Sequence, residues 1–342
     1  MGIVWVLLLG GIASWMLTGF LRRYALGRSL MDIPNERSSH DMPAPRGGGL
    51  AIVLSFLCSL VFLDAFDVRS NALLWALLGS GAWVALIGFI DDHGHIPARW
   101  RLFLHFIGAG WALAWMGGLP PLMVFDVTVD LGWPGHFLAA VYLVWLLNLY
   151  NFMDGIDGIA GIEALTVCLG GVALYILSPV DDVIWMMPVL LLAAAVVGFL
   201  FWNFPKAKIF MGDAGSGFVG IILGILSIQA AWVMPELFWA WVILLGAFIV
   251  DATLTLIRRV LRGEKFYEAH RSHAYQYASR QLGGHVPVTL AFGAINLFWL
   301  LPVAAFVVLG RLDGVVGVII AYIPLIFLAI YFKAGARELQ EV

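Results

Sequence analysis

The sequence predicts an all-helical protein that crosses the membrane many times. Of its 342 residues, 62% are apolar and only 12% are charged, whereas an ordinary soluble domain has about 25% charged residues. The mean hydropathy is +0.95, and the apolar runs are long enough for membrane-spanning helices rather than barrel strands. This composition excludes a soluble enzyme, a disordered chain and a nucleic-acid-binding protein. Cys58 and Cys168 lie in apolar runs, so no disulfide framework or thiolate metal site is expected.

A helix needs about 20 residues to cross the hydrocarbon core of a bilayer. Apolar segments of about this length recur along the whole chain, separated by short polar connections. Eleven spans are predicted, at residues 3–21, 48–64, 72–90, 102–118, 135–150, 162–178, 185–202, 216–234, 238–256, 287–310 and 315–332. An odd number of spans places the two ends of the chain on opposite sides of the membrane.

The basic residues predict the orientation of these spans. The connecting segments alternate between two compartments, and one set of them carries 17 of the 19 Lys and Arg residues. That set is 22–47, 91–101, 151–161, 203–215, 257–286 and the tail from 333, whereas the opposite loops hold only Arg69 and Arg311. The positive-inside rule places the basic set in the cytoplasm, with the N-terminus outside and the C-terminus inside. Residues 1–342 are therefore expected to form one membrane-embedded domain whose cytoplasmic loops carry the polar site.

The first polar cluster lies between the first two spans. Arg37, His40 and Arg46 could hold phosphate oxygens. The run of three glycines at 47–49 would let the backbone approach a ligand closely. A basic loop that meets anionic lipid headgroups explains the same residues equally well.

The second cluster is the carboxylate pair Asp91-Asp92, at the cytoplasmic end of the third span. Two adjacent acids at a membrane-embedded helix end are costly unless a cation or water reaches them. The helix dipole also disfavours negative charge at this end. Two solvated loop residues are the alternative, but the cost favours a functional pair.

The third cluster repeats an amide or carboxylate at every third position. Asn148, Asn151, Asp154 and Asp157 lie in the run that ends at Gly158. The glycines of this run predict that the fifth span unwinds here into a polar turn. Its carboxylates could hold a metal or accept hydrogen bonds from a base or a sugar, and four such residues without a ligand would be expensive to bury.

The fourth cluster is a glycine-rich turn that leads into the eighth span. Ser216 is expected to cap this helix. Gly212 and the free amides at the helix start, with Lys208 nearby, would form a seat for a diphosphate. Asp213 is placed to bind the Mg²⁺ that accompanies a diphosphate. A tight turn with a stray acid is the alternative.

The fifth cluster occupies the longest cytoplasmic segment. An apolar stripe opposite arginines at 256–262 predicts a helix that lies flat on the membrane surface. His270, Arg271 and His273 follow, and they suit phosphate or sugar better than zinc, which prefers three or four ligands. Asp251, inside the ninth span, is either a functional acid or half of a buried ion pair.

The coincidence of the five clusters is more informative than any one of them. They supply carboxylates, basic groups and glycine turns on one predicted face of the membrane. These are the groups that phosphoryl transfer on a nucleotide substrate requires. The apolar surroundings indicate that the second substrate is a lipid.

These clusters resemble those of the polyprenyl-phosphate N-acetylhexosamine-1-phosphate transferases, the family that contains the phospho-MurNAc-pentapeptide translocase. Asp91-Asp92 looks like the family's acid pair. Residues 148–158 match its Asn-x-x-Asn-Phe-x-Asp-Gly-x-Asp-Gly block, and residues 210–216 match its Phe-x-Gly-Asp-x-Gly-Ser block. The resemblance extends from about Asp32 to His273.

The resemblance implies an enzyme of the bacterial inner membrane that transfers a sugar-1-phosphate from a UDP-N-acetyl-sugar to undecaprenyl phosphate and releases UMP. It implies Mg²⁺, which Mn²⁺ could replace, held by Asp213 with Asp91 and Asp92. It also implies that Asp154 and Asp157 belong to the nucleotide-binding and catalytic block, with Asp91 as the base that deprotonates the lipid phosphate. Direct attack and a covalent aspartyl-phosphate route both stay open. So does a homodimer, for which the chain carries no motif.

One departure from the family bears on the sugar. Relatives that use UDP-GlcNAc carry a His-x-His-His loop, whereas this chain has His-Arg-Ser-His at 270–273. That form resembles the branch that initiates lipopolysaccharide O-antigen, often with FucNAc or QuiNAc, and GlcNAc stays the alternative. The rival class is a transporter or lipid flippase, but such proteins place acids near the midplane of paired repeats, and most acids here are expected at helix ends.

Overall fold

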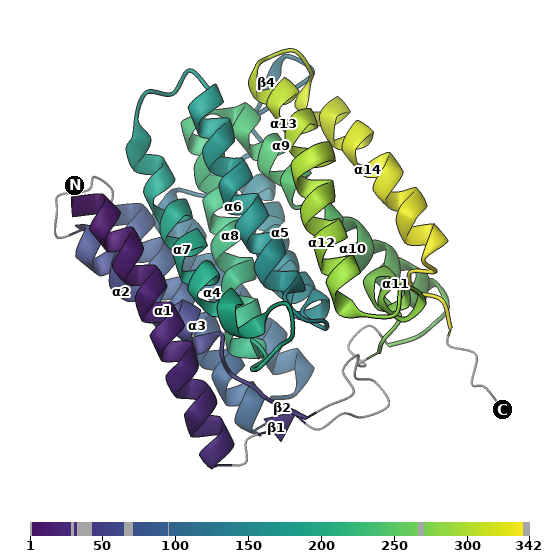
Figure 1. Cartoon of the computed structure of the whole chain (residues 1–342). Helices are drawn as coiled ribbons and strands as arrows, with labels where there is room; N and C mark the ends of the chain where they lie inside the picture. The colour runs from purple at the N-terminus through teal and green to yellow at the C-terminus, as the bar shows by residue number, and fades with distance from the viewer. Residues whose placement is uncertain are drawn as a thin grey trace.

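The computed structural model describes residues 2–28, 31–32, 43–64, 71–94, 96–265 and 270–337. Long helices run side by side in a bundle, with two short hairpins at its ends (Figure 1). The helices are α1 (Gly2–Gly27), α2 (Leu50–Asp64), α3 (Asn71–Gly94), α4 (Ala98–Met116), α5 (Gly132–Met153), α6 (Ile159–Leu177), α7 (Met187–Asn203), α8 (Asp213–Val233), α9 (Pro235–Leu244), α10 (Gly246–Leu261), α11 (Ala274–Gln281), α12 (His285–Ile295), α13 (Leu301–Val308) and α14 (Gly314–Tyr331). The short elements are β1 (Met31–Asp32), β2 (Ala44–Pro45), β3 (Leu122–Val124), β4 (Val127–Val129), the 3₁₀ turn η1 (Val183–Met186) and the π-helical segment η2 (Asn296–Leu300). The antiparallel pairs are β1–β2 and β3–β4.

The helices confirm a polytopic membrane protein. Within the described ranges, eight helices are long and apolar enough to cross a bilayer, or nine if α9 and α10 form one bent span. Each of the eleven predicted spans coincides with a helix or a helix pair. However, α2 has only 15 residues, and α4 carries Arg99 and Arg101 in its first turn. The count of eleven and the orientation therefore stay predictions.

Helix α8 forms the centre of the bundle, where it packs against α3 and α5. Of its most apolar stretch, 89% is buried, against 17% for α1 at the edge (Figure 1). Glycines allow this close packing, because a Cβ at Gly220 would lie 2.7 Å from the carbonyl oxygen of Leu146. Small residues at contacts are how membrane helices approach one another. The rigid centre of the bundle thus carries Asp213 at its first residue.

The span that contains α9 and α10 is broken at Leu245, and its two halves differ in direction by 66°. The apolar stripe at 256–262 belongs to the second half of this broken span. The helix predicted at the stripe is therefore the end of α10, and its position on the membrane surface stays a prediction. The stripe is nevertheless exposed, since Leu261 keeps 81% of its surface accessible.

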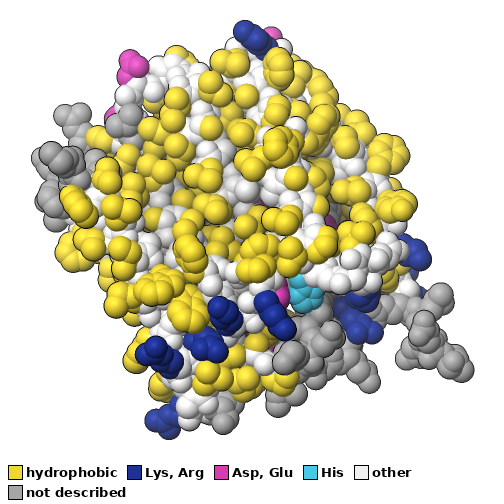
Figure 2. Space-filling model, in the orientation of Figure 1, with side chains coloured by type: hydrophobic (Ala, Val, Ile, Leu, Met, Phe, Trp, Pro, Cys, Tyr) yellow, Lys and Arg dark blue, Asp and Glu magenta, His cyan; other side chains and the backbone are white. Residues whose placement is uncertain are grey.

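The surface has an apolar flank and a basic end. Figure 2 shows hydrophobic side chains across the flank and most Lys and Arg side chains at the lower end of the view, where β1, β2 and α11 lie in Figure 1. Large apolar side chains such as Trp5, Phe137 and Tyr331 are more than half exposed. Such a band suits hydrocarbon rather than water. The basic end is where the polar site lies.

Candidate active site

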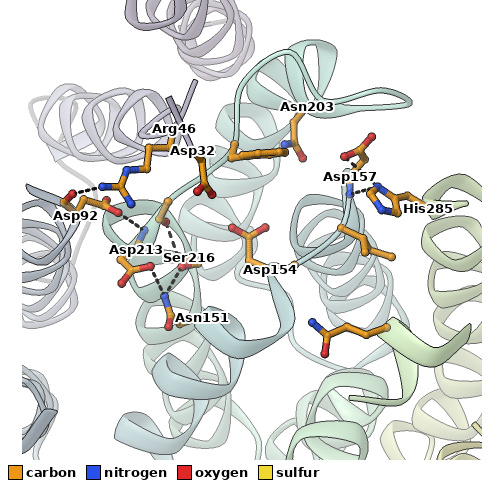
Figure 3. Close-up of a pocket in the computed structure, with 15 residues that line it drawn as sticks. Asp32, Arg46, Asp92, Asn151, Asp154, Asp157, Asn203, Asp213, Ser216 and His285 are labelled. Atoms are coloured by element: carbon orange, nitrogen blue, oxygen red, sulfur yellow. Dashed lines mark hydrogen bonds and ion pairs between the residues drawn. The ribbon is translucent and has the colours of Figure 1, made fainter. Parts of the chain in front are cut away.

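A polar cavity of about 210 Å³ opens at the basic end of the bundle (Figure 3). Its walls come from eight separate stretches of the chain. It is lined by Asp32, Arg46, Asp92, Asn151, Asp154, Gly155, Ile156, Asp157, Asn203, Phe210, Gly212, Asp213, Ser216, Gln276 and His285. Four of the five predicted clusters thus contribute to one space. Arg37 and His40 lie outside the described residues.

The third and fourth clusters meet across the cavity. Asn151, on the last turn of α5, donates its Nδ2 hydrogens to Asp213 Oδ1 at 2.8 Å and to Ser216 Oγ at 3.2 Å. The helix ends at Met153, as its glycine-rich continuation predicts, and α6 begins after Gly158, whose φ is +74°. The unwound turn between them carries Asp154 into the middle of the cavity (Figure 3).

Asp92 caps the first turn of α8. Its two carboxylate oxygens accept from the backbone N–H groups of Asp213 and Ala214, each at 3.4 Å. This approach requires Gly88, because a Cβ there would lie 2.6 Å from the Ala214 nitrogen. The helix begins at Asp213 after Gly212, so the expectation that Ser216 is its cap was wrong. The amides expected to be free for a diphosphate face this carboxylate instead.

Asp91 does not line the cavity, although its carboxylate interacts with Asp213, which does. Its carboxylate pairs with the Arg101 guanidinium and accepts from the Ile96 N–H at 2.6 Å. Neighbouring residues on a helix face directions about 100° apart, so adjacent acids need not share a site. Arg46 stays near the pair on the other side, where its Nη2 donates to the Asp92 carbonyl oxygen at 2.6 Å. Asp91 and Asp92 therefore have different hydrogen-bond partners.

Asp154 is the acid whose protonation is most affected by this arrangement. Burial and the negative charges of Asp213 and Asp92 raise its pKa to about 7. No ion pair joins Asp154 to another side chain in the described ranges. A cation in this cavity would stabilise the ionised form.

Asp157 is fixed by residues from three directions. Its Oδ2 accepts from the Ala207 N–H at 3.1 Å, its Oδ1 lies 3.1 Å from His285 Nδ1, and its carbonyl oxygen accepts from Thr289 Oγ1 at 2.8 Å. His285 is a site residue that the sequence did not predict. It starts α12 directly after Gly283-Gly284, a helix-start pattern that could have marked it.

Two further residues of the cavity also went unpredicted as site residues. Asn203 links two segments beside the cavity. Its Oδ1 accepts from the Gly158 N–H, and its Nδ2 donates to the Ile209 carbonyl oxygen. Asp32 reaches the cavity from β1. Asp32 begins the first polar cluster of the sequence and Asn203 begins the fourth, but neither was assigned a role from the sequence.

The His-Arg-Ser-His segment lies outside the lining of this cavity. Asp251 holds the segment, because its carboxylate accepts from the Ala274 and Tyr275 N–H groups and lies 3.2 Å from His273 Nδ1. His270 stacks on His273 with a centroid distance of 4.9 Å. Burial and the nearby His273 and Arg259 lower the pKa of His270 to about 3, which favours the neutral imidazole.

Three more predicted residues take other places. Lys208 lies over the Trp202 ring at 5.8 Å, and Arg271 does not line the cavity either. Asn148 donates to the Val144 carbonyl oxygen within α5. Gln276, one turn beyond the His-Arg-Ser-His segment, is the residue of this region that reaches the cavity.

A second, apolar cavity of about 820 Å³ runs along α4 and α5 and reaches Leu256 of α10; we call it the groove. Its lining is Ile96, Pro97, Ala98, Arg99, Arg101, Leu102, Phe106, Val141, Val144, Trp145, Asn148, Phe152 and Leu256. Arg101 connects the two spaces. It lines the groove, and its Nη1 lies 3.7 Å from Asp213 Oδ2, which lines the polar cavity.

The part of the chain that the structure describes holds no group of three or more His, Cys, Asp or Glu residues close enough to bind a metal by themselves. Asp92, Asp154 and Asp213 nevertheless line the same cavity. Any cation there would take further oxygen ligands from a substrate.

Comparison with known proteins shows the family. Residues 74–231 match the family model described as glycosyl transferase family 4. The chain is 30% identical to the phospho-N-acetylmuramoyl-pentapeptide-transferase of Halalkalibacterium halodurans, over 83% of this chain and 93% of that protein. It is 27% identical to a probable undecaprenyl-phosphate N-acetylglucosaminyl 1-phosphate transferase of Bacillus subtilis, over 76% of this chain and 72% of that protein.

A third relative covers almost the whole chain. It is the decaprenyl-phosphate N-acetylglucosaminephosphotransferase of Mycobacterium tuberculosis, 29% identical over 93% of this chain and 88% of that protein. One relative is named for phospho-N-acetylmuramoyl-pentapeptide and two for N-acetylglucosamine, and these two are named for different polyprenyl phosphates. What they share is the reaction class. The chain belongs to glycosyl transferase family 4, among the polyprenyl-phosphate N-acetylhexosamine-1-phosphate transferases and the phospho-MurNAc-pentapeptide transferases.

Proposed function

We propose that this protein transfers a sugar-1-phosphate from a UDP-N-acetylhexosamine to undecaprenyl phosphate, with release of UMP. The observation that carries the proposal is the meeting of two unlike cavities at Arg101. The polar cavity offers carboxylates, amides and the Phe210 ring to a nucleotide-sugar. The groove offers apolar walls to a lipid tail, with Arg99 and Arg101 beside it for a phosphate.

The donor is proposed to bind in the polar cavity. Asp157 is held rigidly by Ala207 and His285, so it presents a fixed acceptor to N–H or O–H groups of a base or sugar. Phe210 supplies an aromatic face on which a base can stack. A UDP-sugar satisfies both kinds of contact.

The carboxylates of this cavity suit Mg²⁺, which prefers oxygen ligands. Burial, and after it the negative charges of Asp213 and Asp92, raise the pKa of Asp154, and a divalent ion would favour its ionised form. We propose that Asp213 and Asp154 hold the ion together with Asp92, and that Mn²⁺ can replace it. When bound, the ion would neutralise charge on the donor's diphosphate. Asp91 is engaged by Arg101 and Ile96 and is left out of this set.

Asp91 keeps the role of base in this proposal. It lies beside Arg101, where an acceptor phosphate from the groove would arrive. The acceptor's P–OH proton passes to Asp91, and the freed oxygen attacks the phosphorus that carries the sugar. A P–O bond forms there, and the P–O bond to UMP breaks. The covalent alternative, in which an aspartate attacks first, predicts a phosphorylated enzyme.

The sugar and the final glycan belong to the proposal as well. The relatives' names favour GlcNAc, whereas the segment at 270–273 favours FucNAc or QuiNAc, the sugars of an O-antigen initiator. We propose an inner-membrane enzyme whose polar cavity faces the cytoplasm, because the same end of the bundle gathers most of the basic residues (Figure 2).

The test is UMP release by detergent-purified protein with undecaprenyl phosphate, Mg²⁺ and a panel of UDP-sugars. The panel holds UDP-GlcNAc, UDP-GalNAc, UDP-FucNAc, UDP-QuiNAc and UDP-MurNAc-pentapeptide. UMP that depends on both lipid and Mg²⁺ with one of the sugars supports the proposal. Folded protein that neither binds nor turns over any of them would overturn it, and substrate movement in vesicles without UMP would favour a transporter.

A further inference from the structure

A third cavity, of about 20 Å³, lies where the other two meet; we call it the junction. It is lined by Val84, Gly88, Arg101, His105, Leu147, Asn148, Asn151, Asp213 and Gly217. Arg101 and Asn148 also line the groove, and Asn151 and Asp213 also line the polar cavity. The junction therefore adjoins both the lipid side and the donor side.

His105 belongs to the junction alone. It follows Arg101 by one helical turn on α4, so the two side chains share a face. Its exposed fraction is 5%, and it lines neither the groove nor the polar cavity. The family blocks at 148–158 and 210–216 do not include it.

His105 Nδ1 is buried and has no hydrogen-bond partner in the described chain. The other polar groups here are engaged: Arg101 pairs with Asp91, and Asn148 Nδ2 donates to Val144. Of the buried side-chain atoms around the junction, His105 Nδ1 is the one without a partner among the described residues. Such an atom is costly in a folded protein, so it indicates a group that arrives from outside.

The size of the junction limits what can arrive. A cavity of roughly 10–15 Å³ is the smallest that holds one water molecule, and the junction is only slightly larger. It therefore accommodates one oxygen atom of a phosphate and not the whole group. His105 contributes to the lining of the junction, and a neutral imidazole carries one N–H that can donate to such an oxygen.

We propose that His105 is an acceptor-binding residue, whose imidazole N–H donates to one phosphate oxygen of the polyprenyl phosphate as that oxygen enters the junction. This inference rests on the proposed function. The acceptor is favoured over the donor because α4 forms a wall of the groove and contributes no residue to the polar cavity. His105 and Arg101 then hold the acceptor phosphate from the same helix, next to Asp213.

The test compares three substitutions at His105. Leu removes the polar atom, Asn keeps polarity but shortens the side chain, and Gln keeps both polarity and reach. Affinity for undecaprenyl phosphate is measured without donor by native mass spectrometry. Leu and Asn should weaken it about tenfold to a hundredfold, the effect of losing one hydrogen bond to a charged group, whereas Gln should stay within about threefold. Phe103→Leu, on the lipid-facing side of the same helix and 56% exposed, is the matched control and should change nothing.

Steady-state kinetics supply the second measurement. The KM for undecaprenyl phosphate should rise in His105→Leu and His105→Asn, while the KM for the UDP-sugar stays unchanged. Unchanged acceptor affinity in both variants would overturn the inference, as would an equal rise in both KM values. The failure of the proposed function is separate, because it appears as wild-type protein that releases no UMP, while acceptor binding is still measured without turnover.

Discussion

Asn151 and Asp213, 62 positions apart in the chain, are joined by a hydrogen bond of 2.8 Å between Nδ2 and Oδ1. The bond ties the unwound end of α5 to the first residue of α8. Because α8 is the most deeply buried span, the bond fixes the polar turn to the most rigid part of the bundle. The preorganisation that phosphoryl transfer requires thus depends on the contact between two polar clusters.

Replacing Asp213 by Asn should abolish most activity without unfolding the protein. The amide keeps the size of the side chain but loses the charge that faces the cavity. UMP release should fall roughly a hundredfold or more, the loss typical of removing a major electrostatic group from an active site. Asp181→Asn, on an exposed loop, is the control. An Asp213→Asn variant with near wild-type rates would remove this residue from the mechanism.

The stability of the metal-free protein should fall as pH rises. Asp154 has a pKa of about 7 in the folded protein, against 3.8 without burial and the Asp213 and Asp92 charges. A raised pKa contributes stability that is complete below the unfolded value and is lost as pH rises through the folded value. The unfolding temperature in EDTA should therefore drop between about pH 4 and pH 8. Asp154→Asn should flatten the slope, and Mg²⁺ should restore stability at the upper end; a slope unaffected by Asp154→Asn contradicts the assignment.

Replacing His285 by Ala should weaken donor binding selectively. Asp157 would keep the Ala207 N–H but lose the ring at 3.1 Å that fixes its other oxygen. The KM for the UDP-sugar should rise about tenfold, the value of roughly one hydrogen bond, with the acceptor KM unchanged. The control is His136→Ala, near the start of α5 and far from Asp157, which also loses one hydrogen bond, from the Leu119 N–H. Equal effects from both variants would point to general destabilisation.

Replacing Arg101 alone should destabilise the protein more than replacing Arg101 and Asp91 together. Asp91 is only 4% exposed, and a buried carboxylate without its cation costs about 3–5 kcal/mol. Arg101→Met should lower the unfolding temperature, and the double variant Asp91→Asn/Arg101→Met should recover part of the loss. Thermal unfolding in detergent measures both. Additive losses in the double variant would show that the pair is not coupled.

A buried acid inside the bundle should tolerate Gln and not Ala. Glu163 of α6 is fully buried, and its Oε2 accepts from Asn296 Nδ2 at 2.8 Å. Glu163→Ala leaves that amide with Thr166 alone and should destabilise the protein by about 1–3 kcal/mol. Glu163→Gln keeps an acceptor oxygen and should stay close to wild type. Equal unfolding temperatures for both variants would show that this bond contributes nothing.

The sequence predicted the helices well because hydrophobic length alone decides where a chain crosses a membrane. The break at Leu245 was missed, since apolar residues continue through it and only packing bends the chain there. Asp91 and Asp92 were treated as one site because adjacency in sequence does not show which way each side chain faces. The structure directs one toward Arg101 and the other toward α8.

The remaining site residues depended on distant contacts. His285 meets Asp157 across 128 positions, and no local spacing marks such a pair. The histidines at 270 and 273 also depend on a distant contact, and their role in binding stays a prediction. Their spacing suggested a ligand site, but Asp251 binds their segment from inside the bundle. That acid was predicted to be either functional or part of an ion pair, and the structure gives it a hydrogen-bonding role at the start of α11.

The bend at Leu245 sends α10 away from the axis of α9 and brings Leu256 to the edge of the groove. Side chains along this edge, such as Leu102 and Val141, are more than a third exposed. A lipid substrate can therefore enter the groove laterally from the bilayer, and its tail need never pass through water. The quantity that sets the rate of encounter is then the number of acceptor molecules per unit area of membrane. Adding inert lipid while the total amount of acceptor stays constant should therefore slow the reaction as much as removing acceptor to reach the same surface density.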